Sequence, residues 1–396
     1  MRDELAAAFR EQERFAAGYS PLYAHLFAVV AGWLADERPD PVVDWLLQAA
    51  APRRPFDVTL LLPAALHRDV LAGIPEVAPL ASFYPSAGGR VPEPHSPEFA
   101  AALRGVILAR GEALAAFIGR ANVQTNETGR GLAWLLPLSA LGWPAVHLLE
   151  LGASAGLNLV AEHRAYRLAD AAAPERTLLE LGNGLLPQFT TLTSGRAELP
   201  RLSCCPTILS RTGGDIHPFI LESAEDEPAL AAFLWADQVD RVGRLREGIA
   251  ALRAAAATAA PVRLFQLNLP DDLPDFLDEH APRPFHAPLV IFNTTVTMYL
   301  PGGGAGLRQA IVPWAARQAA PILWLQWEPQ DLTGLPDLSG LEPPTPGWQS
   351  WTADLWRGSG DGRRHHHWQL ARVHPHGTEL EWTAQFDTFL RVTMQI

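Results

Sequence analysis

The N-terminal part of the chain has a helical spacing of apolar residues. From residue 1 to about 135 they recur at steps of three and four, as along one face of an α-helix; two such series are Leu22, Leu26, Val29, Val30 and Leu34, and Leu103, Val106, Ile107, Ala109 and Ala113. Turns rich in proline and glycine, such as 84–89, separate the series. The pattern predicts a helical N-terminal module over residues 1–135.

The pattern changes at about residue 136. Short apolar runs alternate with helical stretches at 228–257 and 306–318; the runs are 146–151, 207–210, 262–267, 288–292 and 322–327. Strands that alternate with helices favour a mainly parallel sheet with helices on both faces. At the end, 367–373 and 379–392 flank a Pro-His-Gly turn and predict an antiparallel hairpin. We therefore predict an α/β fold with a Rossmann-like domain over 136–396.

A glycine-rich turn follows the first predicted strand and leads into a helix-like segment. Glu150, Gly152, Ser154 and Gly156 form the pattern E-x-G-x-S-x-G. Such a turn lets the backbone approach a ligand, and a helix N-terminus offers N–H groups to an anion. A carboxylate at position 150 would repel a pyrophosphate, so the turn suits the methionine end of S-adenosylmethionine better than a dinucleotide. A packing turn without a ligand would have the same pattern.

The same residues also fit G-x-S-x-G, the nucleophile elbow of serine hydrolases, with Ser154 as the nucleophile. Asp275 and either His374 or His376 follow in the order that a catalytic triad needs. However, that fold has several strands before the elbow, whereas the segment before this turn is helical. We therefore prefer a ligand-binding turn to a serine hydrolase.

Polar residues also end the later strands. Asp215 ends the second, Asn268 follows the third, and Asn293 and Thr294 follow the fourth. Because open α/β sheets bind ligands at the carboxyl ends of their strands, Asp215 is a candidate for ribose hydroxyls and Asn268 for an adenine edge. Asn293 and Thr294 would face the reaction site and orient the nucleophile. Helix capping would account for the same residues.

These features resemble class I S-adenosylmethionine-dependent methyltransferases. Nearly the whole chain also resembles an uncharacterised bacterial family of domain-of-unknown-function proteins; the stretches are 19–23, 83–86, 124–130, 150–158, 211–215, 235–241 and 374–377. The resemblance implies a methyltransferase-like fold but no known substrate. Ala236 stands where we expect proline. Asn293 stands where the family tends to carry histidine, which argues against a catalytic histidine there.

The first hypothesis is therefore a methyltransferase with S-adenosylmethionine as its cofactor and a small or medium-sized substrate. The candidates for holding the cofactor are Glu150, Gly152, Ser154, Gly156, Asn158, Asp215, Asn268, Asn126 and Arg130. Arg130 could pair with the methionine carboxylate, although it could equally belong to a helix cap. A Rossmann module that binds a nucleotide-like ligand without catalysis is the second hypothesis, and the serine hydrolase is the third.

Other polar clusters have two interpretations each. Trp235, Asp237, Gln238 and Arg241 lie on the long predicted helix, where they could line the site or make a buried contact between helix and sheet. In the run 365–367 only the outer two histidines would share a face of a strand, so a solvated edge is favoured over a metal site. His374 and His376 could act as a general base or simply belong to a turn.

The amino-acid composition argues against several other classes of protein. All 31 basic residues are arginine, which excludes the lysine of P-loop enzymes and of pyridoxal phosphate enzymes. The formal net charge of −12 makes nucleic acid an unexpected partner. The sequence shows neither a signal peptide nor a membrane span. The adjacent Cys204 and Cys205 fit a reducing compartment, so we expect a cytoplasmic protein.

Overall fold

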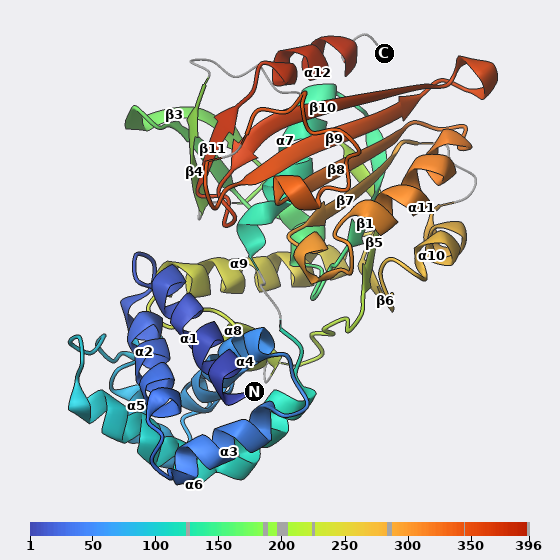
Figure 1. The fold of residues 1–396 in the computed structure, drawn as a ribbon. Coiled ribbons are helices and arrows are strands. Elements are labelled where there is room, and N and C mark those ends of the chain that lie inside the picture. The colour runs from blue at the N-terminus through green and yellow to red at the C-terminus, as the bar shows by residue number, and fades with distance from the viewer. Residues whose placement is uncertain are drawn as a thin grey trace. The chain divides into compact units, whose positions relative to one another are not determined.

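The computed structural model describes residues 1–123, 127–184, 189–195, 205–223, 226–282, 287–343 and 345–393. Asn126 and Cys204, which were considered above, lie outside these residues. The chain forms two compact units: Met1–Asn126 with Leu221–Leu245, and Glu127–Ile220 with Arg246–Ile396 (Figure 1). The first is the helical unit and the second the sheet unit. The helical unit thus takes in a segment that we had placed in the second domain.

Proline and capping side chains begin several helices of the helical unit. Ser20, Asp40 and Ser96 each accept a backbone N–H of the helix that they precede, and a proline stands in the first turn of each of those helices. One apolar core joins the helices, as their sequence spacing predicts. The helices are α1 Arg2–Ala16, α2 Pro21–Ala35, α3 Pro41–Ala50, α4 Pro55–Leu71, α5 Ala78–Ala81, α6 Pro97–Arg120 and α8 Asp226–Ala231, with the first part of α9 Val239–Ala256.

The helix predicted over 228–257 is two helices, α8 and α9, separated by 232–238. His67 on α4 lies against this break, with its Nδ1 atom 2.9 Å from the carbonyl oxygen of Leu234 and 3.3 Å from that of Ala232. A carbonyl that faces a tertiary partner is not available to a continuous helix, so packing overrides the local helical pattern.

The sheet unit contains one sheet of 11 strands, in the order β3-β2-β4-β11-β10-β9-β8-β7-β1-β5-β6. The strands β6, β5, β1, β7 and β8 are parallel to one another, as predicted. The strands are β1 Ala145–Leu151, β2 Tyr166–Asp170, β3 Ala173–Leu181, β4 Phe189–Ser194, β5 Thr207–Asp215, β6 Val262–Gln266, β7 Leu289–Thr294, β8 Ile322–Glu328, β9 Gln349–Arg357, β10 Arg364–Val373 and β11 Glu379–Trp382.

Helices cover both faces of this sheet. Alternate residues of β1 and β7 belong to two different apolar cores, which is why these strands read as continuous apolar runs. One core includes α7 (Leu132–Leu141) and α12 (Gln385–Thr393), and the other includes α10 (Leu273–His280) and α11 (Ala305–Ala316). The layers are therefore helix, sheet and helix (Figure 1).

The C-terminal hairpin is present but shorter than expected. β10 and β11 pair antiparallel, whereas the second half of the predicted strand 379–392 forms α12. β2, β3 and β4 were not predicted. Within the described chain no single helix has both the length and the apolar character needed to cross a membrane; the bent pair Pro55–Leu71 and Pro75–Ala81 meets the test only when its helices are taken together.

Candidate functional site

The turn after β1 is closed by backbone hydrogen bonds. The carbonyl of Gly214 accepts the N–H groups of Gly152 (2.8 Å) and Ala153 (3.1 Å), and the carbonyl of Ala153 accepts that of Gly156 (2.7 Å). The following segment, Leu157–His163, is a 3-10 helix and not the regular helix that we expected. Because these N–H groups bond within the fold, the turn is a poor cradle for a pyrophosphate.

Close packing explains both glycines of the turn. Gly152 has a φ of 77°, and a Cβ atom there would lie 2.6 Å from Cγ2 of Val296. Gly156 has a φ of 72°, and its Cβ would lie 2.8 Å from Cγ1 of Val262. A side chain at either position would therefore be strained and would also collide with its neighbour.

Asp215 ends β5, as the sequence predicts, and fixes the turn from the side. Its Oδ2 accepts the N–H of Ser154 (2.8 Å) and its Oδ1 accepts that of His217 (2.9 Å). A carboxylate oxygen has two lone-pair positions, so Oδ1 and Oδ2 of Asp215 each keep one position for a donor on a ligand. The bond also holds Ser154 at a φ of 49°, a conformation that costs a non-glycine residue about 1–3 kcal/mol.

Glu150 lies near the carboxyl end of β1 and is only 2% exposed. Its Oε2 and the Oδ1 of Asn158 are buried without a hydrogen-bond partner in the described part of the chain. Burial raises the pKa of Glu150 well above its usual value; the side chain of Asn158 and the charge of Arg130 act in the opposite direction, while Asp215 adds to the rise. Unsatisfied buried acceptors cost about 1–3 kcal/mol each, so these two oxygens mark a place for a donor.

Asn293 and Thr294 end β7, as predicted, and both are buried. The Asn293 amide donates from Nδ2 to Oε1 of Glu328 (2.7 Å), and its Oδ1 accepts from Nε1 of Trp324 (2.8 Å). Both ends of this amide are therefore engaged within the sheet. Thr294 makes no side-chain hydrogen bond with another described residue. Their catalytic roles stay predictions.

Sequence reasoning missed Glu328, which ends β8. It is fully buried and also accepts the N–H of Val296 (2.9 Å) and the hydroxyl of Thr297 (2.8 Å). Burial raises its pKa. An acid that ends an apolar run is the pattern that identified Glu150, and it could have identified Glu328.

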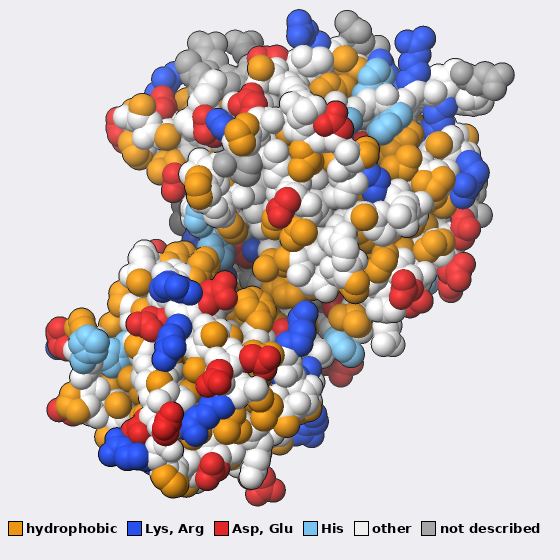
Figure 2. All heavy atoms as spheres, in the orientation of Figure 1, with side chains coloured by type: hydrophobic (Ala, Val, Ile, Leu, Met, Phe, Trp, Pro, Cys, Tyr) orange, Lys and Arg blue, Asp and Glu red, His pale blue; other side chains and the backbone are white. Residues whose placement is uncertain are grey.

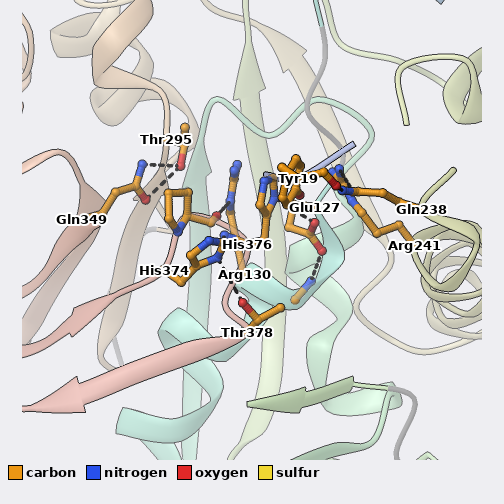
Figure 3. Close-up of polar contacts among 12 residues, drawn as sticks. Tyr19, Glu127, Arg130, Gln238, Arg241, Thr295, Gln349, His374, His376 and Thr378 are labelled. Atoms are coloured by element: carbon orange, nitrogen blue, oxygen red, sulfur yellow. Dashed lines mark hydrogen bonds and ion pairs between the residues drawn. The ribbon is translucent and has the colours of Figure 1, made fainter. Parts of the chain in front are cut away.

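Thr295 was missed as well. It is a β-branched residue with a φ of 57°, and its hydroxyl bonds with Gln349 at 3.1–3.2 Å (Figure 3). This backbone conformation is rare for threonine, and such strain clusters at functional sites. No sequence pattern signals it.

The turn 374–377 lies at the same edge of the sheet as these residues. β8 is antiparallel to β9 and β9 to β10, so β10 points in the direction of β8 and ends at the same edge. Arg130, only 4% exposed, donates from Nε to the carbonyl of Pro375 (2.9 Å). Nδ1 of His376 lies 3.2 Å from Oε2 of Glu127 (Figure 3). The structure thus brings together polar residues from 127–130 and 374–377.

Asn268 is not part of this group. Its side chain is exposed, and only its backbone is bonded: the N–H donates to Oδ2 of Asp272 (3.3 Å), and the carbonyl accepts the N–H of Asp272 (3.0 Å). Asn126, the other amide that we proposed for cofactor binding, lies outside the described residues.

His365 and His367 do share a face of β10, as expected for alternate residues of a strand. They are not a purely solvated edge, because both contact Oδ1 of the buried Asp354, at 2.7 and 3.1 Å. Arg308 pairs with the other oxygen of Asp354 at 3.0 Å. Among the residues that the structure describes, no group of three or more His, Cys, Asp or Glu side chains could hold a metal ion.

A separate group of polar residues around Asp237 belongs to the helical unit. The Asp237 carboxylate accepts from the hydroxyl of Ser20 (2.6 and 2.8 Å) and from the N–H of Leu22 (3.0 Å). Nε2 of Gln238 donates to the carbonyl of Tyr19 (3.1 Å) and its Oε1 accepts from Arg241 (2.9 Å; Figure 3). The contact is thus with the start of α2 and not with the sheet. Asp237 and Gln238 precede α9, contrary to our expectation.

The comparisons with known proteins identify a family. Residues 6–382 match the model of a family described as an uncharacterized protein conserved in bacteria, DUF2332. Because the match covers nearly the whole chain, the protein belongs to this family. No curated protein and no solved structure matches it.

Proposed function

We propose that this member of the DUF2332 family is an S-adenosylmethionine-dependent methyltransferase that acts on a small or medium-sized substrate. The observation that supports it most is the buried Oε2 of Glu150, which has no hydrogen-bond partner in the described chain. On one side of β1 the chain order continues to β5 and β6, and on the other side to β7 and β8. Such a reversal point is where open α/β sheets bind ligands, outside the carboxyl ends of the strands.

The residues around Glu150 suit the amino-acid end of the cofactor. An α-ammonium group has three N–H donors, and the unpartnered Oε2 of Glu150 and Oδ1 of Asn158 are acceptors. Arg130, whose charge acts on Glu150, would hold the α-carboxylate. Burial disfavours the ionised form of Glu150, and an ammonium group bound beside it would favour that form.

Other residues would hold the nucleoside. The two remaining lone-pair positions of Asp215 suit the ribose diol, and Asn268 stays the candidate for the adenine edge. Gly152 and Gly156 would shape the turn through their packing. When bound, the cofactor supplies an electrophilic methyl group on a sulfonium centre. The protein would exclude water, and the Thr294 hydroxyl and the strained Thr295 would orient the acceptor.

One face of the molecule agrees with a small-molecule substrate. The face drawn in Figure 2 mixes acidic and basic side chains on both units, and its described residues show no broad basic area. Proteins that bind nucleic acid normally present such an area.

Calorimetry with two ligands tests the cofactor assignment. S-Adenosylhomocysteine carries the amino-acid end, whereas 5′-methylthioadenosine lacks it. We expect Glu150→Gln to weaken binding of the first by about 10–100-fold, the scale of a charged hydrogen bond, and to leave the second unchanged. Asp337→Asn, an exposed acid, is the matched control. Equal loss for both ligands would contradict the role of Glu150, and no binding of either by the parent would end the proposal.

A serine hydrolase is the second candidate, favoured by the positive φ of Ser154, which an elbow also needs. Against it, Asp275 is exposed and bonds to neither His374 nor His376. Labelling of the parent, but not of Ser154→Gly, by a fluorophosphonate probe would establish the hydrolase. Binding of cofactor without turnover would instead indicate a non-catalytic ligand-binding module.

A further inference from the structure

The turn 374–377 is held from several sides. The carbonyl of Pro375 accepts from Nε of Arg130 (2.9 Å), and the carbonyl of Gly377 accepts from the hydroxyl of Thr191 (2.7 Å). Gly377 has a φ of 70°, and a Cβ there would lie 3.5 Å from the ring of Trp327 on β8. A turn fixed in this way presents its side chains in defined directions.

Glu127 sets the orientation of one of the two histidines. Its Oε1 accepts the N–H of Gly129 (3.3 Å), and its Oε2 faces Nδ1 of His376 (3.2 Å). The carboxylate accepts only, so a neutral His376 has its proton on Nδ1 and its lone pair on Nε2. Glu127 itself is held in place, because Arg164 and the hydroxyl of Tyr166 both donate to the carbonyl of the adjacent Thr128.

The neutral His374 has the opposite tautomer to His376. Its Nδ1 accepts the backbone N–H of His376 (3.3 Å) and lies 3.0 Å from the hydroxyl of Thr378. A neutral His374 therefore carries its proton on Nε2. Burial lowers the pKa of His374, which favours this neutral form. The turn thus presents one imidazole as a base and the other as an N–H donor, with ring centres 5.5 Å apart.

The register of the strands places the turn at the same edge of the sheet as the candidate cofactor site. Leu151 lies opposite Asn293, and Thr294 lies opposite Trp327. On the next strands Trp327 lies opposite Trp351, and Gln349 lies opposite Val373, the residue before His374. The carboxyl end of β10 therefore continues the edge formed by the carboxyl ends of β1, β7 and β8.

We propose that His376, positioned by Glu127, is the general base of the transferase, and that the methyl acceptor is a hydroxyl, phenol or amine that must lose a proton. This inference rests on the proposed function. The acceptor heteroatom gives its proton to Nε2 of His376 and takes the methyl group, and the electron pair of the broken carbon–sulfur bond stays on sulfur. His374 donates a hydrogen bond that holds the acceptor. A thiolate acceptor would need no such base.

Nitrogen NMR of the imidazoles gives a readout that is independent of turnover. We expect His376 of the parent to carry its proton on Nδ1 when neutral, and Glu127→Gln to allow a mixture of both tautomers, because a side-chain amide can donate as well as accept. His366→Gln, on the same strand outside the turn, is the control and should leave the His376 signals unchanged. A parent His376 protonated on Nε2 would overturn the inference.

Transfer to probe acceptors tests the chemical role. With labelled cofactor, catechol and benzylamine represent acceptors that carry a proton, and 4-nitrothiophenol represents one already ionised. We expect His376→Gln to lower transfer to the first two by about 100-fold or more, to spare the thiolate, and to keep the affinity for S-adenosylhomocysteine. Unchanged transfer by His376→Gln, or no transfer by the parent to either proton-bearing probe, overturns the inference alone. If the parent does not bind S-adenosylhomocysteine, both this inference and the proposed function are overturned.

Discussion

The buried His67 of the helical unit should make the stability of the protein depend on pH. Its Nε2 lies 2.7 Å from the hydroxyl of Ser86, and its Nδ1 lies 2.9 Å from the carbonyl of Leu234, so the neutral ring is satisfied at both nitrogens. Burial lowers its pKa from 6.5 to about 4, although its contacts with the carbonyls of Ala232 and Leu234 act in the opposite direction.

The size and sign of this effect on the free energy of unfolding follow from the linkage between proton binding and folding. Because the folded-state pKa of His67 lies below the unfolded value, the unfolded chain takes up this proton first as the pH falls. Stability from this group is therefore complete above pH 6.5 and is lost between 6.5 and about 4. A shift of this size corresponds to about 3 kcal/mol.

The contribution of His67 to stability can be measured by urea unfolding of the parent and of His67→Gln, monitored by circular dichroism at pH values between 7.5 and 4.5. Glutamine retains a donor and an acceptor but does not titrate in this range. We expect the parent to lose about 2–3 kcal/mol more than the variant over this interval, whatever the variant costs at pH 7.5. His217→Gln, at an exposed histidine, should behave like the parent. Equal pH dependence of the parent and His67→Gln would refute the reasoning.

Three further substitutions test the sheet unit. Gly152→Val should lower the free energy of unfolding by about 2–4 kcal/mol because its side chain would collide with Val296, and urea unfolding should show partial recovery on adding Val296→Ala. Asp354→Asn should cost about 3–5 kcal/mol in the same assay, because it leaves the largely buried Arg308 without its carboxylate. Asp215→Ala should weaken S-adenosylhomocysteine binding by about 1.5–3 kcal/mol in calorimetry; unchanged affinity would exclude a ribose contact.

The central strands were predictable because burial on both faces leaves a continuous apolar run. β7 and β8 are buried at every residue, and the sequence shows each of them without ambiguity. β3 is mostly exposed, and β4 pairs with β2 and with β11, a strand that lies far along the chain. Such strands have no apolar run of their own, and long-range pairing leaves no local signal.

In the candidate site, too, contacts between residues far apart in the chain could not be predicted from the sequence. The sequence identified the polar residues that end β5 and β7, because position along a strand is a local property. It did not show that the Asn293 amide is engaged by Trp324 and Glu328, which lie 31 and 35 residues away. Nor did it show that His365 and His367 converge on Asp354, a residue of the neighbouring strand. Partners supplied by other strands decide what a polar residue can do.

Two carboxylates from the stretches that resemble the family illustrate how the structure separates such residues. Asp237 accepts bonds from Ser20 and Leu22, so its charge is satisfied by the fold, and its role is to hold the segment 235–238 against α2. Glu150, which is more deeply buried, has an oxygen that is out of reach of water and has no partner in the described chain. An oxygen in that state destabilises the fold, since no donor offsets its burial. The sequence alone gives both residues equal weight, whereas their hydrogen bonds assign Asp237 to the scaffold and leave Glu150 with an unpartnered oxygen, which is why our proposal places the ligand donor there.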